Sequence, residues 1–429
     1  MILKVTATDS LKGAIQLPGS KSHTIRAFIV AACGGNSLIR FPSDCDDALA
    51  ALRTAKALGA RVKKRNNSTW QIRAKSGRKL KSARIHVGES GTVLRFLLPL
   101  AALKFEHAVI TGEGTLVGRP NKHLIVALRK IGFRITGKGL QGSVPVILDG
   151  GVFSGGTIRI DGTISSQFVS ALLIAVPALP SDTRVIITGK RPVSQDYIVM
   201  TEQVLKKSGI RVIRKSARNF LIKGRQKFKG LKNFKVPSDY GLAAFPMAAA
   251  ILLKSRVTLK GFLKDELLQS DGRILDVLRK MGIRFTKTAL SIKIHGPQQL
   301  KGGSFSLKDS PDLLPILAVL ALFAKGPSRF YDIGHARVKE SDRISDLRKE
   351  LLKVGADVRE KSGEIRIYPR PRYKSNQVLD PHRDHRLAMA FSVLGLKVGL
   401  SVKDIECVRK SYPAFTQDLK RLSANVSLR

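Results

Sequence analysis

The sequence predicts an α/β protein made of six copies of one structural unit, and two periodic features of the chain indicate this. The first is an amphipathic helical pattern that ends in a glycine and runs directly into a strand-like segment. It occurs five times, with glycines 73 to 77 residues apart, at Gly59, Gly132, Gly209, Gly282 and Gly355. A glycine after the last helical turn accepts the left-handed backbone that ends many helices, and Lys or Arg in that turn suits the helix dipole.

The second feature is a helical pattern that is hydrophobic nearly all round and is therefore expected to be buried. It occurs six times, as TIRAFIVAAC, TVLRFLLPLAAL, QFVSALLIAVPAL, GLAAFPMAAAIL, LLPILAVLALFA and HRLAMAFSVLGL. Six copies in 429 residues give about 72 residues per unit, enough for two helices and several short strands. A sixth glycine-ended helix is missing near the C-terminus, so we expect the N-terminal strand to complete the last copy.

Six units most simply form two lobes of three, and the chain should cross between them near Gly19 and near Pro237. We therefore expect one lobe from residues 1–18 and 237–429, a second lobe from residues 19–236, and an active-site cleft between them. No long linker is visible at either crossing.

Short polar segments precede each apolar helix: GSKSH, GESG, ISSQ, PSDY, DSPD and HRDH. Each supplies Ser, Asp or Gly as an N-cap, and at any single position an ordinary cap is sufficient explanation. A helix N-terminus also presents free N–H groups and partial positive charge, which bind phosphates and carboxylates. The recurrence of these segments at one period favours a set of converging anion sites.

Composition shows a strongly basic protein, with 76 Lys+Arg against 32 Asp+Glu and a net charge of +44. Such charge is compatible with nucleic acid or with small anionic substrates. No apolar run reaches the roughly 18 residues that a membrane span needs, and no signal peptide is apparent, so we expect a cytoplasmic protein. Three widely spaced cysteines without a CxxC pair argue against a zinc site. The basic strings RVKKRNN, SGRKLKSAR and KGRQKFKGLKNFK are interpreted as exposed surface.

Ten motifs in a fixed order carry a family resemblance. They are LPGSKSHTIRAF, SDCDDALAALRTAKALGA, GESGTVLRF, GRPNKHLIVALRKIG, DGTISSQFVSALL, VSQDYI, SPDLLPILAVLALFAKG, RVKESDRI, DHRLAMAFSVLGL and KSYPAF, across residues 18 to 415. With these motifs the chain resembles the enolpyruvyl transferases, and within them the 5-enolpyruvylshikimate 3-phosphate synthase branch. The resemblance implies a two-lobed fold of six βαβαββ units, three per lobe, of the inside-out α/β barrel type.

The resemblance also implies an enzyme of the shikimate pathway, a 3-phosphoshikimate 1-carboxyvinyltransferase of aromatic amino-acid biosynthesis. Such enzymes transfer the enolpyruvyl group of phosphoenolpyruvate to the 5-hydroxyl of shikimate 3-phosphate and release phosphate by addition and elimination. Two small anionic substrates are then the partners, no metal or other cofactor is needed, and we expect a monomer without specific nucleic-acid binding.

Matching positions imply the site residues. The candidates for catalysis are Asp312, Glu340 and Lys21. Those for shikimate 3-phosphate are Lys21, Ser22, Arg26, Ser165, Ser166, Gln167, Ser194, Asp312, His335 and Lys339. Those for phosphoenolpyruvate are Lys21, Gly91, Arg119, Gln167, Arg343, Arg386 and Lys410. Glu340 is implied as the acid and base at C3, while Asp312 and Lys21 are rival bases for the 5-hydroxyl. Arg95 and Arg337 complete a cluster of cations expected to serve the substrates.

The residues alone also permit structural roles. The string RVKESDR resembles a solvated helical face on which Glu340 and Arg343, three residues apart, are neighbours. Asp312 opens an apolar helix, where an N-cap is the common use, and structural hydrogen bonding is the expected role of Asp384 and His385.

Three departures from the family pattern stand near these positions. Glu89 replaces a usual Asn beside the phosphoenolpyruvate site, where we expect Arg95 or a neighbour to neutralise it. His335 replaces an Asn and should make binding of shikimate 3-phosphate more sensitive to pH. Tyr240 and Gly241 replace a pair of small residues.

Two other functions are compatible with parts of the sequence. The transferase acting on UDP-N-acetylglucosamine shares the repeat, but that branch has KN after the first turn and an active-site Cys, whereas this chain has GSKS and no Cys in TGEGTLVGRP. A basic nucleic-acid-binding protein on a related fold is supported by the net charge, but aromatic residues make up only 6% and no stacking motif or zinc pattern appears.

Overall fold

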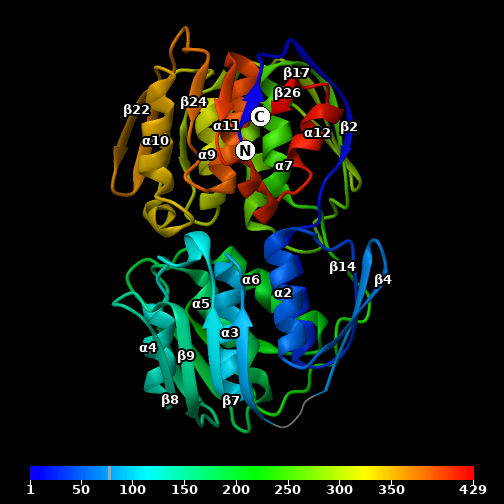
Figure 1. Cartoon of the computed structure of the whole chain (residues 1–429), viewed down its shortest axis with the longest axis vertical. Coiled ribbons are helices and arrows are strands. Elements are labelled where there is room, and N and C mark those ends of the chain that lie inside the picture. Colours follow the sequence, from blue (N-terminus) through cyan, green and yellow to red (C-terminus); the bar gives the residue numbers. More distant parts are fainter. Residues whose placement is uncertain (76–78) are drawn as a thin grey trace. The chain divides into compact units, whose positions relative to one another are not determined.

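A computed structural model describes residues 1–75 and 79–429 of the chain, so the start of the basic string SGRKLKSAR lies outside the described residues. The chain divides into two compact units (Figure 1). Unit 1 comprises Met1–Pro18 and Pro237–Arg429, and unit 2 comprises Gly19–Val236. Among the described residues, no helix is long and apolar enough to cross a membrane.

Unit 2 contains three sheets of four strands. In sheet order they are β14 (Phe234–Lys235), β3 (Gly35–Arg40), β5 (Thr69–Ala74) and β4 (Arg61–Asn66); β6 (Leu80–His86), β7 (Phe105–Thr111), β9 (Ser143–Gly151) and β8 (Phe133–Lys138); and β10 (Gly156–Asp161), β11 (Thr183–Thr188), β13 (Asn219–Ile222) and β12 (Val212–Ser216). In each sheet the first two strands run parallel and the last two form an antiparallel hairpin. The same topology three times in one unit confirms the predicted repeat.

Unit 1 repeats this arrangement. Its sheets are β2 (Ser10–Gln16), β15 (Lys254–Lys260), β17 (Ser291–Gly296) and β16 (Thr286–Lys287); β19 (Ser304–Ser306), β21 (Ser328–Tyr331), β23 (Glu364–Tyr368) and β22 (Asp357–Lys361); and β24 (Gln377–Leu379), β25 (Leu400–Val402), β1 (Leu3–Val5) and β26 (Val426–Leu428). A short pair, β18 (Leu300–Lys301) and β20 (Ala324–Lys325), is added. The N-terminal β1 lies between β25 and β26, so the first residues complete the last sheet.

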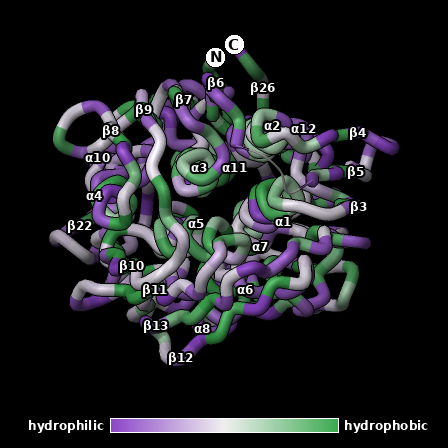
Figure 2. The backbone as a smooth tube through the Cα atoms, turned by 90° about the horizontal axis from the view of Figure 1, so that it is seen from below, coloured by the Kyte–Doolittle hydropathy of each residue, from purple (hydrophilic) through white to green (hydrophobic). Residues whose placement is uncertain are grey.

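Apolar helices form the core of each unit. In unit 2 they are α1 (Lys21–Cys33), α3 (Gly91–Lys104) and α5 (Ser166–Ala175); in unit 1 they are α7 (Tyr240–Leu252), α9 (Leu314–Ala321) and α11 (His385–Val398). The helices α7, α9 and α11 pack against one another, and Figure 1 shows them side by side. Figure 2 shows α3 nearly end-on, with hydrophobic colours prominent on its turns. Burial on nearly all sides agrees with the all-round apolar pattern of these segments.

The second helix of each repeat is amphipathic: α2 (Asp46–Ala57), α4 (Lys122–Lys130), α6 (Asp196–Lys207), α8 (Ile274–Lys280) and α10 (Arg343–Lys353). The five predicted glycines follow these helices with φ between 81° and 102°, so their left-handed role is confirmed. A sixth amphipathic helix that ends in glycine is absent from the described residues, as the sequence indicated, but the last copy still has a second helix. The helix α12 (Phe415–Arg421) takes that place, with Ser423 in the left-handed backbone at φ 68°. The pattern was missed because a serine stands where the other five copies have glycine.

The basic strings lie at the surface as expected. The lysines and arginines of RVKKRNN are exposed, and so are those of SGRKLKSAR that are described. In KGRQKFKGLKNFK the basic residues are exposed while Phe228, Leu231 and Phe234 are buried. These three surface strings carry part of the positive charge, and the apolar residues of the third are buried.

Candidate functional site

The first helix of unit 2 begins at Lys21, after the N-cap Ser20. The Lys21 Nζ donates a 3.0 Å hydrogen bond to Asp47 Oδ2, in the first turn of α2. Both side chains are largely buried, so the lysine is held at the helix start beside Ser22. Asp47 is a site neighbour that the sequence did not reveal, because acidic residues in a first helical turn are explained by the helix dipole alone.

Arg26 lies one turn further along α1 and is 1% exposed. Its Nε donates to Thr201 Oγ1 at 2.8 Å, its Nη2 to the Tyr197 carbonyl at 3.1 Å, and its Nη1 to the Ser22 carbonyl at 2.9 Å. Burial lowers the pKa of Arg26 to about 10, so it stays charged at neutral pH. Arg26 therefore ties α1 to α6, which follows the buried, left-handed Ser194.

The starts of α3 and α5 are joined through Gln167. Its Oε1 accepts a 2.6 Å hydrogen bond from Arg95 Nη1, and its Nε2 donates to Thr92 Oγ1 at 2.8 Å. Ser165 is the N-cap of α5, accepting from the Gln167 backbone N at 3.2 Å, and Ser166 is the first helical residue. The ISSQ turn thus presents a helix N-terminus next to an arginine, an arrangement suited to a phosphate.

Gly91 opens α3 and allows a guanidinium to lie against the helix start. A Cβ at Gly91 would stand 2.7 Å from Arg119 Nη1, which is too close for any side chain. Arg119 is 6% exposed. The combination of an arginine and unpaired N–H groups at a helix start forms a second place for an anionic group.

Glu89 accepts hydrogen bonds from Thr115, in the loop that precedes Arg119. Its Oε2 accepts hydrogen bonds from the Thr115 hydroxyl at 2.8 Å and from the Thr115 backbone N at 3.1 Å. The hydrogen bonds described for Arg95 go to Gln167, to Asn121 and Ser165, and to the Pro120 carbonyl. Two neutral donors of Thr115 therefore bind this carboxylate oxygen.

In unit 1, Asp312 lies among three cations. Its carboxylate is 2.6 Å from Arg343 Nη1, 3.0 Å from Arg386 Nη2 and 3.8 Å from Lys339 Nζ. Burial raises the pKa of Asp312, but Arg386, Lys339 and Arg343 outweigh it and hold the pKa well below its usual range. The N-cap interpretation is wrong, because Asp312 lies inside the 3-10 turn Pro311–Leu313 and its side chain turns to the cations.

Arg343 connects three carboxylates and is 1% exposed. Its Nε donates to Asp384 Oδ2 at 2.6 Å, its Nη1 to Asp312 Oδ1 at 2.6 Å, and its Nη2 to Glu340 Oε2 at 2.8 Å. The other Glu340 oxygen is 3.8 Å from Lys410 Nζ. Asp384 also caps α11 by accepting from the Arg386 backbone N, which agrees with its expected structural role. The structure thus brings the predicted residues of RVKESDR, DSPD and DHR into one cluster.

The expected helical face of RVKESDR is only partly present. The helix α10 begins at Arg343 with Asp342 as its N-cap, and Glu340 precedes it in non-helical backbone. Glu340 and Arg343 nevertheless pair. Arg337 donates to Asp342 and to Ser345, each at 2.8 Å, at the start of α10.

His335 corrects another expectation. It is 8% exposed, and burial together with the charge of Lys339 lowers its pKa to about 3. A histidine with this pKa is neutral throughout the physiological range, so the predicted pH sensitivity from His335 does not follow. Its buried Nε2 has no hydrogen-bond partner among the described residues.

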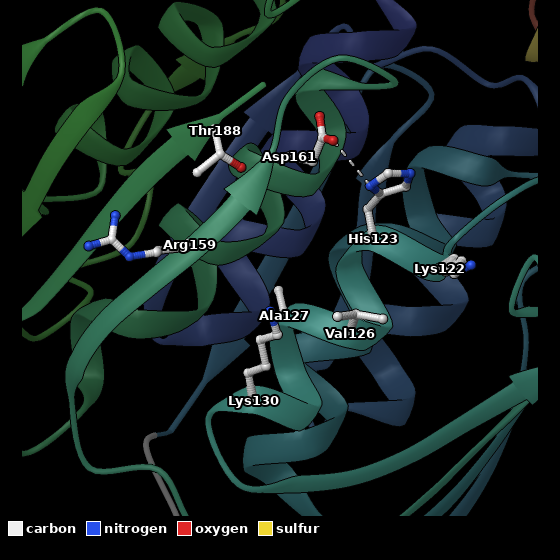
Figure 3. Close-up of a pocket in the computed structure, with 8 residues that line it drawn as sticks. All are labelled: Lys122, His123, Val126, Ala127, Lys130, Arg159, Asp161 and Thr188. Carbon is white, nitrogen blue, oxygen red and sulfur yellow. Dashed lines mark ion pairs between the residues drawn. The ribbon is translucent and has the colours of Figure 1, made fainter. Parts of the chain in front are cut away.

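A pocket of about 420 Å³ lies in unit 2 between α4 and the ends of β10 and β11 (Figure 3). Its lining residues are Lys122, His123, Val126, Ala127, Lys130, Arg159, Asp161 and Thr188. In Figure 3 the His123 and Asp161 side chains face each other, and their ion pair measures 3.6 Å. These eight residues include none of the predicted site residues. Over residues 1–75 and 79–429, no group of three metal-ligating side chains is found.

Comparison with known proteins identifies similar chains. A family model described as EPSP synthase (3-phosphoshikimate 1-carboxyvinyltransferase) matches residues 5–419. A 3-phosphoshikimate 1-carboxyvinyltransferase from Methanocaldococcus jannaschii is 34% identical, with all of both chains covered, and one from Methanococcus aeolicus is 32% identical, with 99% of each covered. The structure of an EPSP synthase from Acinetobacter baumannii matches at 26% identity with a TM-score of 0.77, covering 100% of this chain and 99% of that one. The enolpyruvyl transferase NikO from Streptomyces tendae, at 18% identity and a TM-score of 0.79, shares the fold.

Proposed function

The chain belongs to the EPSP synthase family and is a transferase of the shikimate pathway, and on this premise we propose which residues perform its reaction. The reaction joins the 5-hydroxyl of shikimate 3-phosphate to C2 of phosphoenolpyruvate, and phosphate leaves. Both substrates are anions, so the protein must supply cations for a carboxylate and two phosphates, and groups that move two protons.

Unit 2 supplies the residues that bind the 3-phosphate of shikimate 3-phosphate. The 3-phosphate is bound by Ser165, Ser166 and Gln167 at the start of α5, with Ser194 and Arg26 completing the site. Lys21 and Ser22 at the start of α1 bind the same substrate. This proposal is supported by the helix starts that carry these residues, since free N–H groups and partial positive charge stabilise a phosphate.

Phosphoenolpyruvate is bound by cations from both units. In unit 2 these are Lys21 and Arg119, with Gly91 and Gln167 beside them; in unit 1 they are Arg343, Arg386 and Lys410. Arginine suits this task because its planar fork binds a carboxylate or phosphate through two parallel hydrogen bonds. That the two units act at one shared cleft remains a prediction from the sequence.

Glu340 moves the proton at C3. As the 5-hydroxyl oxygen bonds to C2, the C3 methylene takes a proton from Glu340 and becomes a methyl group, giving a tetrahedral intermediate. In the elimination step Glu340 takes a proton back from C3 as the bond from C2 to the phosphate oxygen breaks. Its contacts with Arg343 and Lys410 support this proposal, because they place it beside the cations assigned to the same substrate.

The base for the 5-hydroxyl is Asp312 or Lys21. Asp312 is ionised and able to accept a hydrogen bond from the 5-hydroxyl. Lys339 and His335 bind the same substrate, shikimate 3-phosphate. Its low pKa makes it a weak base while Arg386, Lys339 and Arg343 surround it. When substrate anions take over these cations, the basicity of Asp312 rises, so substrate binding itself prepares the group for the proton.

The observation that carries the proposal is the cluster of Asp312, Glu340 and Arg343 with Lys339, Arg386 and Lys410, in a chain of this family. The test is phosphate release from phosphoenolpyruvate by the purified protein. We expect release only when shikimate 3-phosphate is present, and none with UDP-N-acetylglucosamine. Release with the nucleotide sugar alone would overturn the proposed acceptor.

A further inference from the structure

Two carboxylates of unit 1 share one guanidinium group. Arg386 Nη2 lies 3.0 Å from Asp312 Oδ2 and 3.5 Å from Asp271 Oδ2. The side chains of Arg386 and Asp271 are 5% and 9% exposed. Asp312 also pairs with two further cations, Arg343 and Lys339. The ion pair described for Asp271 is the longer contact with Arg386, at 3.5 Å. Asp271 is therefore the less stabilised of the two anions.

One oxygen of Asp271 is left without a partner. Its Oδ1 is buried and accepts no hydrogen bond from the described residues. Burying an ionised carboxylate oxygen without a hydrogen-bond donor costs free energy, whereas protonation removes the charge and reduces this cost. This side chain is thus built to exist in two states, ionised against Arg386 or protonated beside it.

The charged groups around Asp271 belong to four segments of unit 1. Asp239 caps α7, Arg386 opens α11, Asp312 lies in the turn Pro311–Leu313, and Lys339 follows the turn Gly334–Val338. Burial, with the charges of Asp312 and Asp239, raises the pKa of Asp271 to about 7, although Arg386 and Lys339 act in the opposite direction. Its change of charge therefore falls in the physiological range.

The position of Asp271 is fixed by the residues that depart from the family pattern. A Cβ at Gly241 would stand 2.4 Å from Asp271 Oδ2, so the carboxylate occupies the space that glycine leaves open. Tyr240 OH donates to Asp265 Oδ1 at 2.9 Å, and Gln269 Oε1 accepts from the Tyr240 backbone N at 3.2 Å. Both contacts hold the loop before Asp271 against the start of α7.

We propose that Asp271 is a positioning residue for the reaction: when ionised it is one of two carboxylates that pair with Arg386, and its protonation removes this competition with an anionic substrate. This inference rests on the proposed role of Arg386 in binding phosphoenolpyruvate. Protonated Asp271 leaves Arg386 with one carboxylate fewer and adds no negative charge near the substrate. Ionised Asp271 competes with the substrate for the same guanidinium group.

The expected pH dependence follows from this competition. Below pH 7 Asp271 is protonated and phosphoenolpyruvate binds well, whereas above pH 7 the ionised form prevails and KM for phosphoenolpyruvate rises. If only the protonated form binds, KM at pH 8 is raised about tenfold, because about one molecule in ten is then competent. The variant Asp271→Asn has no charge to gain and lacks this rise.

The test compares KM for phosphoenolpyruvate, at saturating shikimate 3-phosphate, between pH 6 and pH 9. Wild type, Asp271→Asn and the control Asp276→Asn are measured at each pH, so ionisation of the substrate cancels in the ratio. Asp276 is an exposed residue of α8 that pairs with Arg279. We expect the ratio of wild-type to Asp271→Asn KM to be near one at pH 6 and about tenfold at pH 8. A ratio that stays constant with pH would overturn the inference, since a merely structural role changes KM equally at all pH values.

A second measurement needs no variant. Infrared difference spectra of the wild-type protein should show a protonated carboxyl band that is lost with a midpoint near pH 7. Phosphoenolpyruvate should move this midpoint to higher pH, because a bound anion opposes ionisation of Asp271. The absence of any carboxyl group titrating between pH 6 and pH 8 would also contradict the inference.

Failure of the inference can be told from failure of the proposed function by the variant Arg386→Lys. If Arg386→Lys leaves KM for phosphoenolpyruvate unchanged, the assignment of Arg386 is wrong and the premise falls. The other outcome is that Arg386→Lys raises KM for phosphoenolpyruvate while the ratio of wild-type to Asp271→Asn KM stays constant with pH. In that case the assignment of Arg386 holds and only the role of Asp271 is wrong.

Discussion

Asp384 Oδ2 accepts a 2.6 Å hydrogen bond from Arg343 Nε, and this buried pair orients the arginine that contacts both Asp312 and Glu340. Asp384 is 0% exposed and Arg343 1% exposed. Burial lowers the pKa of Arg343, but the surrounding carboxylates of Asp384, Asp312 and Glu340 outweigh it and hold the pKa well above its usual value. Arg343 is thus charged and fixed before any substrate arrives.

We predict that Asp384→Asn destabilises unit 1 and lowers turnover. The amide still accepts a hydrogen bond but no longer balances the buried charge of Arg343, and we expect a loss of about 2–4 kcal/mol in the free energy of unfolding. Urea unfolding measures this loss, with Asp276→Asn as the matched control on an exposed pair. Equal stability of the two variants would show that the pair contributes little.

Glu340→Gln should remove proton transfer at C3 while leaving the substrates bound. The amide keeps a hydrogen-bond acceptor for Arg343 but cannot donate and take back the proton, so we expect turnover to fall by at least about 100-fold. Phosphate release measures turnover and calorimetry measures binding of shikimate 3-phosphate. The control is Glu266→Gln, which removes an exposed carboxylate beside Lys264. Near wild-type turnover in Glu340→Gln would move the acid and base role to Asp312 or Lys21.

Gly91→Ala should raise KM for phosphoenolpyruvate. Its methyl group would meet Arg119 Nη1 at 2.7 Å, and the guanidinium group must move away from the start of α3. Loss of one charge-assisted contact of about 1.5–3 kcal/mol predicts a rise of about 10-fold to 100-fold. Gly118→Ala is the control, because a Cβ there meets nothing within 4 Å. An unchanged KM would show that Arg119 is not needed at this position.

His335→Asn should leave the pH profile of KM for shikimate 3-phosphate unchanged in shape between pH 5.5 and pH 8. The pKa of His335 is about 3, so the imidazole is neutral over this range and an amide replaces one neutral group by another. Burial favours the neutral form, so His335 becomes charged only when the pH falls toward 3. In a histidine NMR titration of the wild type, a His335 midpoint between pH 6 and pH 7 would contradict this prediction.

Local patterns accounted for much of the fold and for the family. The glycine after each amphipathic helix, the all-round apolar helices and the polar residue before each of them depend on neighbours within a few turns, so the sequence displays them directly. The six units, the family and its reaction follow from these patterns and from the ordered motifs. The sixth amphipathic helix was missed because Ser423 takes the left-handed position that glycine holds elsewhere.

The partners of the charged residues were decided only by the tertiary structure. Lys21 pairs with Asp47 from the next helix, and Arg386 meets Asp271 from 115 positions earlier in the chain. Arg337 pairs with Asp342 at the start of α10, and burial keeps His335 neutral at physiological pH. A chain with 76 basic residues offers many possible ion pairs. Which of them form depends on distance and burial in three dimensions, and these are set by the packing of the folded chain.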